Sequence, residues 1–444
     1  MLRELNQIIK LALPIILTQV GQLTLGLVDT FVIGKVGADE LAGVGAGSNL
    51  FATGMVIGLG CLLGMDPLCS QAYGAKQYKT CHQYLTQGFL LALFISIPIT
   101  LITFLAGNYY HLIGPSENLL LHLYPYINTV TWGMPAVLLF FALQRYWQSV
   151  GSVIPITLIT IFANIINYCV DVALVWGKLG PWDFPQMGSQ GVAIATLSAR
   201  YFIFIATLIY TLWKLRKQIS LKLSSLKPNW NLQKNLVKIG LPAGTQYGLE
   251  VGAFSIVTLL ASKLATSSMA AHQIALSITS FTFMLPLGVS SAASVRVGNL
   301  IGANKKQKAI TSGWLCIFLS TVIMSFSAVI LFIFPSQILT TFTSNTMVIT
   351  TGIGVLFWGA LYQVVDGIQV TTSGALRGIG ETKGPLIANL IGHYPLGLFI
   401  GIILCFNKGY GIKGLWCGTT LGLFSVSMLV LFLWKKRTKK INKL

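Results

Sequence analysis

The sequence predicts an all-α polytopic membrane protein with twelve transmembrane helices in two six-helix lobes. Its 444 residues are 54% hydrophobic and only 9% charged, with a mean hydropathy of +0.74. These values are too apolar for a soluble globular domain. The chain also divides into twelve apolar runs, each about as long as the roughly 20 residues that a helix needs to cross a bilayer. Finally, the second half of the sequence repeats the first.

Short polar breaks separate the apolar runs, so each run predicts one membrane-spanning helix. The first run is too long for a removable signal peptide and lacks a cleavage site, so we expect it to be the first span. The runs lie near residues 7–33, 44–68, 84–106, 124–147, 153–176, 189–213, 234–260, 271–297, 310–333, 349–375, 384–405 and 413–434.

The repeat appears when the first span is aligned with the seventh. Pro14 falls on Pro242 and Gly74 on Gly302, each 228 positions further along, and Gly151 matches Gly380. Each copy has an even number of spans, so the copies share one orientation and form a parallel repeat. The predicted domains are an N-lobe (1–213), a basic cytoplasmic linker (214–233), a C-lobe (234–434) and a basic cytoplasmic tail (435–444).

The charge distribution predicts the topology. The chain has 30 Lys and Arg against 11 Asp and Glu, a net charge of +19. If both termini lie in the cytoplasm, Arg200 falls inside a span and only five Lys lie outside: Lys35, Lys178, Lys263, Lys408 and Lys413. Because basic residues favour the cytoplasmic side, this predicts a multi-pass protein of the inner (cytoplasmic) membrane. The basic clusters are expected to contact anionic membrane lipids and not nucleic acid.

The eleven acids fall into two groups. Six lie in tails or loops, where we expect them to be solvated: Glu4, Asp39, Glu40, Glu117, Asp183 and Glu381. Five lie in spans or at their ends: Asp29, Asp66, Asp171, Glu250 and Asp366. A charge at the centre of a lipid-spanning helix costs at least about 2.5 kcal/mol, so such acids usually face a cavity and carry function. Burial favours the neutral carboxyl, which suits these residues to carry protons.

Several spans of the first half carry polar side chains with oxygen atoms that could bind the same ion. Asp29 lies in the first span, and Thr196 lies in the sixth. Asn167 and Asp171, four residues apart, share one face of the fifth span. Together they offer hard oxygen ligands suited to H⁺ or Na⁺. The alternative for Asp171 is a permanent ion pair with Arg200 of the adjacent span.

The second half carries a different acidic group. Glu250 lies near the middle of the seventh span, and Asp366 lies in the tenth with Tyr362 one turn before it. The repeat does not copy this group, since Glu250 aligns with Gln22. H⁺ and Na⁺ are candidate ligands here too. The alternative is that the acids of both halves only make structural hydrogen bonds.

Three further residues in or near the spans can each be interpreted as functional or as structural. Asp66, at the cytoplasmic end of the second span, is either a contact of a cytoplasmic gate or a solvated acid at a helix end. His272 and His393 are more typical of packing histidines than of proton relays. The seven cysteines are scattered without metal-binding spacing, so we expect them to pack as small apolar residues. No cofactor is expected apart from H⁺ or Na⁺ as the coupling ion.

Several motifs resemble the multidrug and toxic compound extrusion (MATE) family, in matching order over essentially the whole chain. They are PLCSQAYGAKQ (67–77), SSMAAHQIALSI (267–278), SVRVGNLIGA (294–303) and LYQVVDGIQVTTSGALRGIGET (361–382). The resemblance implies a two-lobe efflux pump that exchanges organic cations for H⁺ or Na⁺.

The resemblance also implies site residues from more than one branch of the family. Glu250 and Asp366 match acids of the C-lobe cation site in NorM-type and eukaryotic members. Pro14 matches the proline at which span one bends in the DinF-type branch. Asp66 is similar to a eukaryotic feature, where a Glu commonly stands. The N-lobe site of the DinF-type branch corresponds to Asp29, Asn167, Asp171 and Thr196, although a shifted register would use Asn164 in place of Asn167.

The predicted function is therefore a secondary active multidrug efflux antiporter and not an enzyme. It would export small cationic, amphipathic or aromatic drugs through a central cleft by alternating access, as a monomer. A lipid-linked precursor flippase of the same superfamily is the alternative, and an integral membrane enzyme is a weaker one. No P-loop is present in the sequence, which excludes ATP-driven pumping.

Overall fold

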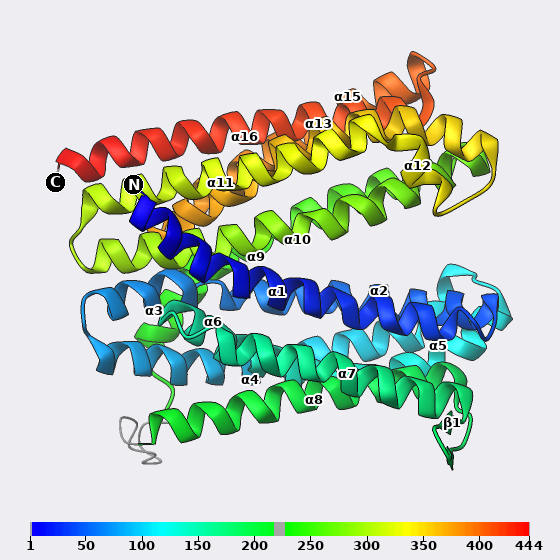
Figure 1. Cartoon of the computed structure of the whole chain (residues 1–444), viewed down its shortest axis with the longest axis horizontal. Coiled ribbons are helices and arrows are strands. Elements are labelled where there is room, and N and C mark those ends of the chain that lie inside the picture. The colour runs from blue at the N-terminus through cyan, green and yellow to red at the C-terminus, as the bar shows by residue number, and fades with distance from the viewer. Residues whose placement is uncertain (1, 217–226, 444) are drawn as a thin grey trace. The chain divides into compact units, whose positions relative to one another are not determined.

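The computed structural model describes residues 2–216 and 227–443 (Figure 1). Part of the predicted linker and the last residue of the predicted tail lie outside this range. Two short strands, β1 (Lys178–Leu179) and β2 (Trp182–Asp183), form a small antiparallel hairpin. The main helices are α1 (Leu2–Ile33), α2 (Ala38–Leu62), α3 (Met65–Gly74), α4 (Tyr78–Asn108), α5 (Glu117–Val130), α6 (Met134–Ser149), α7 (Ile154–Trp176), α8 (Gly188–Leu215), α9 (Trp230–Ala261), α10 (Thr266–Gly302), α11 (Lys306–Ile333), α12 (Pro335–Thr340), α13 (Thr346–Gly378), α14 (Lys383–Ile391), α15 (Phe399–Ile402) and α16 (Gly411–Lys443).

The predicted twelve-helix membrane fold is confirmed. Within the described residues, eleven helical segments are long and apolar enough to cross a membrane. The helix α9 is the twelfth long helix, and its polar residues, Glu250 among them, make it less apolar than the others. Some spans contain a break, as where α2 continues into α3. Two π-helical turns, η4 (Gly392–Leu398) and η5 (Ile403–Asn407), continue the span that α14 begins.

The internal repeat is visible in the backbone. Lys76 and Asn304 occupy equivalent positions after α3 and α10, and both adopt left-handed conformations with φ of 60° and 57°. Gly151 and Gly380 do the same after α6 and α13, with φ of 79° and 84°. Left-handed residues of this kind end helices. The two halves therefore end matching helices in the same way.

The contacts divide the chain into two compact units that do not follow the sequence halves. Unit 1 comprises Met1–Ile16, Asp66–Lys76 and Thr245–Leu444, and unit 2 comprises Leu17–Met65 and Gln77–Gly244. The helices α1 and α9 each contribute to both units. The divisions in these helices fall two residues after Pro14 and Pro242, which are equivalent in the repeat. The lobes at 1–213 and 234–434 stay a prediction about the repeat.

Glycines allow close helix crossings within each unit. In unit 1, a Cβ atom on Gly74 would lie 2.0 Å from the Asn299 carbonyl oxygen, and one on Gly302 would lie 2.0 Å from that of Gln71. These two contacts are equivalent in the repeat and join α3 to α10. In unit 2, Gly60 of α2 packs directly on Gly244 of α9. Small residues of this kind let membrane helices approach closely.

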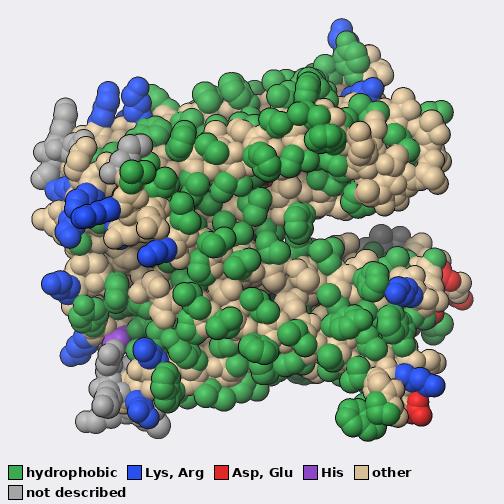
Figure 2. Space-filling model, viewed as in Figure 1, with side chains coloured by type: hydrophobic (Ala, Val, Ile, Leu, Met, Phe, Trp, Pro, Cys, Tyr) green, Lys and Arg blue, Asp and Glu red, His purple; other side chains and the backbone are tan. Residues whose placement is uncertain are grey.

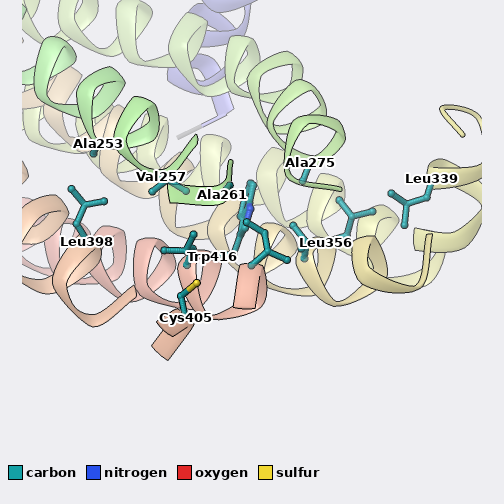
Figure 3. Close-up of a cluster of buried hydrophobic side chains, with 12 residues drawn as sticks. Ala253, Val257, Ala261, Ala275, Leu339, Leu356, Leu398, Cys405 and Trp416 are labelled. Atoms are coloured by element: carbon teal, nitrogen blue, oxygen red, sulfur yellow. The ribbon is translucent and has the colours of Figure 1, made fainter. Parts of the chain in front are cut away.

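An apolar cluster fills part of unit 1 around Trp416, which is almost fully buried (Figure 3). Val257 and Ala261 of α9 and Leu356 of α13 pack in the same cluster. It therefore fixes the relative positions of α9, α13 and α16 within unit 1. Two of these helices carry the acids predicted for the second half.

Candidate ion-coupling sites

Asp29 is the centre of a buried polar cluster in unit 2. Its Oδ1 accepts a hydrogen bond of 3.1 Å from Asn167 Nδ2, and its Oδ2 accepts one of 2.5 Å from Thr196 Oγ1. The three side chains come from α1, α7 and α8, and all are buried. The structure thus brings together three of the four residues predicted from the first half.

Asp171, the fourth predicted residue, lies one turn beyond Asn167 on α7 and is fully buried. Its carboxyl group lies within electrostatic range of that of Asp29, and neither of its oxygens has a hydrogen-bond partner among the described residues. Two buried carboxyl groups close together disfavour each other's ionised form, so a proton on one of them stabilises the pair. The geometry therefore suits one proton held by Asp29 or Asp171.

Arg200 does not form the ion pair that was the alternative for Asp171. Its guanidinium carbon lies 3.8 Å from the centre of the Phe51 ring, a cation–π contact. The ion pairs found among the described residues do not include one between Arg200 and Asp171. Asp29 is close enough to feel the charge of Arg200.

Asn164 takes a different position from Asn167. Its Nδ2 donates to the carbonyl oxygens of Gly21 at 3.0 Å and Thr160 at 2.9 Å, so it links α7 to the backbone of α1. A hydrogen bond of 2.8 Å between Thr18 and Thr157 joins the same two helices. Asn167 and not Asn164 therefore contacts Asp29.

The second acidic group lies in unit 1. Glu250 of α9 and Asp366 of α13 are buried, as is Tyr362, and the three lie within electrostatic range of one another. Glu250 Oε2 and Asp366 Oδ1 have no hydrogen-bond partner among the described residues. No Lys, Arg or His among the described residues forms an ion pair with Glu250 or Asp366. A buried carboxylate without a partner is costly, so this pair suits a proton or a small cation.

Aromatic side chains surround Tyr362. Its ring packs edge-on against Phe254, with centroids 5.6 Å apart, and against Trp416, with centroids 6.3 Å apart. The Trp416 indole N–H donates to His272 Nδ1 at 3.2 Å, and His272 Nε2 lies 2.9 Å from Thr258 Oγ1. Because Nδ1 accepts, this hydrogen bond assigns His272 as neutral with its proton on Nε2. His272 is accordingly a packing residue in this structure.

Sequence reasoning missed the contact that reaches α9 beside Glu250. The Tyr394 hydroxyl, in the π-helical turn η4, donates to the Leu249 carbonyl oxygen at 3.3 Å. π-Helical turns inside α-helices often occur at functional sites. His393 precedes Tyr394 and is buried. A proline within an apolar run, here Pro395, is the signal that could have indicated this irregular turn.

Asp66 is not a solvated acid. Its Oδ2 lies 3.2 Å from Arg377 Nε at the end of α13, and both side chains are buried. Tyr247 of α9 lies close to Arg377 as well. All three residues belong to unit 1.

Glu4, which the sequence predicts to be solvated, is also paired. Its carboxylate accepts hydrogen bonds from Arg296 Nε at 2.6 Å and Nη2 at 2.9 Å, and from Ser312 Oγ at 2.7 Å. The two arginine contacts form a bidentate pair, the strongest geometry for this interaction. Within unit 1, Glu4 and Asp66 thus attach two segments of the first sequence half to helices of the second half.

None of the described residues form a group of three or more His, Cys, Asp and Glu that could hold a metal ion. Both acidic groups instead combine two carboxyl groups with neutral oxygen or nitrogen atoms. Donor sets of this kind fit H⁺ or a hard cation such as Na⁺.

Comparison with known proteins gives consistent matches. The MatE family model matches residues 14–173 and 242–403. The chain is 32% identical to the probable multidrug resistance protein NorM of Synechocystis sp., over 99% of this chain and 96% of that protein. It is 30% identical to the multidrug resistance protein NorM of Photobacterium profundum, over 96% and 94%. A crystal structure of the eukaryotic MATE transporter AtDTX14 superposes with a TM-score of 0.87 at 21% identity, covering 100% of this chain and 99% of that one. With a family model that spans both halves of the repeat and relatives that match end to end, the chain belongs to the MatE family of transporters.

Proposed function

We propose that the chain is a secondary active multidrug efflux antiporter of the inner membrane, with both termini in the cytoplasm. It exports small organic cations in exchange for H⁺ or Na⁺ by alternating access. The names of its relatives support drug efflux, since two of them are NorM proteins described as multidrug resistance proteins. The distribution of Lys and Arg supports the orientation.

The observation that carries the proposal is the pair of buried carboxyl groups in each unit, neither of which forms an ion pair with a basic residue of the described chain. An ionised carboxylate in such a place attracts an organic cation. Binding of H⁺ or Na⁺ from outside cancels the negative charge, so the organic cation is released. Loss of the small ion to the cytoplasm then restores the charge. One charge moving through 100 mV supplies about 2.3 kcal/mol for this cycle.

The aromatic surroundings of the second acidic group fit a cationic, aromatic guest. Tyr362 and Phe254 lie beside Asp366 and Glu250 along α13 and α9. An aromatic face attracts a cation through its quadrupole and also stacks on flat ring systems. We therefore assign drug contact to this group, while H⁺ or Na⁺ binds at either acidic group.

The test is direct. Purified protein in proteoliposomes should move a fluorescent organic cation when a gradient of H⁺ or Na⁺ is imposed, and should not move it without one.

The ion pairs of Asp66 and Glu4 support a gate at the cytoplasmic end. Both pairs join segments of the first half to helices of the second, as do the glycine contacts of Gly74 and Gly302. Opening this end requires that these contacts separate. Pro14 and Pro242 lie near the points where α1 and α9 pass between the units, and helices bend at prolines. We propose that the two helices bend there.

Removing one partner of the Asp66–Arg377 ion pair should destabilise the fold much more than removing both partners. In Arg377→Gln the Asp66 carboxylate stays buried without its partner, which costs about 3–5 kcal/mol. The double variant Asp66→Asn/Arg377→Gln should recover most of the lost stability. The measurement is the melting temperature of the purified protein. Lys178→Gln, which removes the exposed pair with Asp183, is the control and should cost at most about 1 kcal/mol.

The gate itself needs a second readout. Cys69 lies on α3 beside Asp66 and is fully buried. In a variant that keeps Cys69 as its only cysteine, the neutral double variant should react several times faster with a water-soluble maleimide. Unchanged labelling together with additive stability losses would show that the ion pair is ordinary packing.

The lipid-linked precursor flippase has less support. Such a protein needs free buried cations for a pyrophosphate group, whereas the buried and half-buried arginines in the described spans that carry a charge here are already engaged. Arg377 pairs with Asp66, and Arg145 and Arg200 each lie over a phenylalanine ring.

A further inference from the structure

A basic cavity lies at the end of unit 1 that carries both termini of the chain. Its volume is about 290 Å³, near the lower limit for small-molecule pockets. Lys306 at the start of α11 and Arg437 and Lys440 on α16 line it, together with Glu381. Figure 2 shows Lys and Arg side chains of unit 1 gathered at this end.

The charges of the cavity do not cancel. The Glu381 carboxylate is already engaged, because it pairs with Arg437 and accepts a hydrogen bond of 3.1 Å from the Gly384 N–H. Lys306 and Lys440 form no ion pair with any carboxylate in the part of the chain that the structure describes. Two cations therefore face the cavity without compensation. The first turn of α11 begins at Lys306 and adds its positive dipole end.

The fold does not need these charges. The turn at Gly380, which forms one wall of the cavity, has its repeat counterpart at Gly151 with nearly the same φ. In that first copy, Tyr78 takes the place of Lys306 and Ser152 takes the place of Glu381. The first half thus builds the same turn without a charged cavity. The lysines are consequently free to serve a ligand.

The surroundings place the cavity at a membrane surface. Its remaining wall is apolar and includes Ile301, Ile379 and Ile441. The elements that form it are the ends of α10, α11, α13 and α16, and all four belong to candidate membrane spans. An apolar wall beside uncompensated lysines at the ends of membrane spans matches a phosphate group with an acyl chain or glycerol attached.

We propose that this cavity binds a phosphate group, presented by an anionic lipid headgroup or by free phosphate. Lys306 and Lys440 supply the charge, and Arg437 adds a guanidinium held in place by Glu381. The isoleucines contact the apolar part of a lipid ligand. The site is separate from the acidic groups assigned to transport, so its test does not depend on them.

The experiment compares two double variants of equal charge. Lys306→Gln/Lys440→Gln removes the lysines that line the cavity. Lys436→Gln/Lys439→Gln removes two exposed lysines of the same helix that do not line it. The affinity of purified wild type and both variants for phosphatidylglycerol is measured by native mass spectrometry, with phosphatidylcholine as the neutral lipid. Each lysine contributes roughly a fivefold factor, so the first variant should bind phosphatidylglycerol about tenfold or more weakly. The second should stay within about twofold of wild type.

Inorganic phosphate separates the two sources of the ligand. If free phosphate displaces bound phosphatidylglycerol from the wild type, the site recognises the phosphate group alone; if it does not, the site needs the lipid. Either result is compatible with the proposal. Equal weakening in both variants would overturn it, because the lysines would then act only through general surface charge. Melting temperatures of the three proteins show whether either variant has lost its fold.

Discussion

Replacing Asp366 by Asn, or Glu250 by Gln, is expected to reduce efflux of an organic cation about tenfold or more while the protein stays folded. Each change keeps the shape of the side chain but removes a negative charge from a site without a basic partner among the described residues. A hydrogen bond to a charged group is worth about 1.5–3 kcal/mol, which corresponds to a factor of ten or more. Efflux from cells that express equal amounts of each variant is the measurement.

Glu117→Gln is the matched control for these acids. Glu117 is an exposed acid at the start of α5, so its replacement should leave efflux unchanged. Full efflux in both Asp366→Asn and Glu250→Gln would remove the second acidic group from the mechanism. Loss of folded protein in either variant is detected separately from the melting temperature.

Asp29→Asn is expected to remove the response to the ion gradient while binding of the organic cation survives. Asp29 accepts hydrogen bonds from Asn167 and Thr196 and lies within electrostatic range of Asp171. An Asn in its place cannot take up and release a proton. Asp171→Asn should have a similar effect, because it leaves a single carboxyl group where two influence each other's charge. Gradient-driven efflux should fall by about tenfold in each variant.

The readouts for this second prediction are efflux and equilibrium binding of the same fluorescent cation to purified protein. Asp183→Asn, at an exposed acid of the β1–β2 hairpin, is the control. Efflux that still increases with the gradient in Asp29→Asn and Asp171→Asn would exclude the first acidic group from coupling. Loss of cation binding in the same variants would show that the organic cation binds at the acidic group of unit 2.

Hydropathy and repetition predicted most of the fold. Each apolar run became a helical span, in some cases interrupted, because backbone groups in lipid must be satisfied within the span. The helices extend several residues beyond the runs, since their polar end turns need not lie in lipid. The alignments of Gly74 with Gly302 and of Gly151 with Gly380 recur as matching crossings and turns. The assignment of parts of α1 and α9 to different compact units was not predicted, because it depends on how the helices pack.

The positions of Asn167 and Asp171 on one face of α7 could be predicted from their spacing in the sequence. Asn167 and Asp171 lie one helical turn apart, so they had to share a face, and few polar groups in neighbouring spans could meet them. The choice between Asn167 and Asn164 needed the register of α1 against α7, which no local pattern contains. The structure resolves this register through the hydrogen bond from Asn164 to Gly21 and the one from Asn167 to Asp29.

Other contacts lay beyond sequence reasoning. Arg377, at the end of α13, is the partner of Asp66, 311 positions away along the chain. Trp416 fixes the tautomer of His272 from a separation of 144 residues. Both contacts join helices that are distant in sequence, and nothing in the composition of either helix indicates its partner.

The most direct test of the account is transport of a fluorescent organic cation by purified protein in proteoliposomes, with a proton gradient and a sodium gradient imposed separately. The account predicts uphill movement of the cation under at least one gradient and none without a gradient. It also predicts that Glu250→Gln/Asp366→Asn abolishes this movement. Gradient-driven transport of equal rate in the wild type and in a variant that lacks Asp29, Asp171, Glu250 and Asp366 would contradict it.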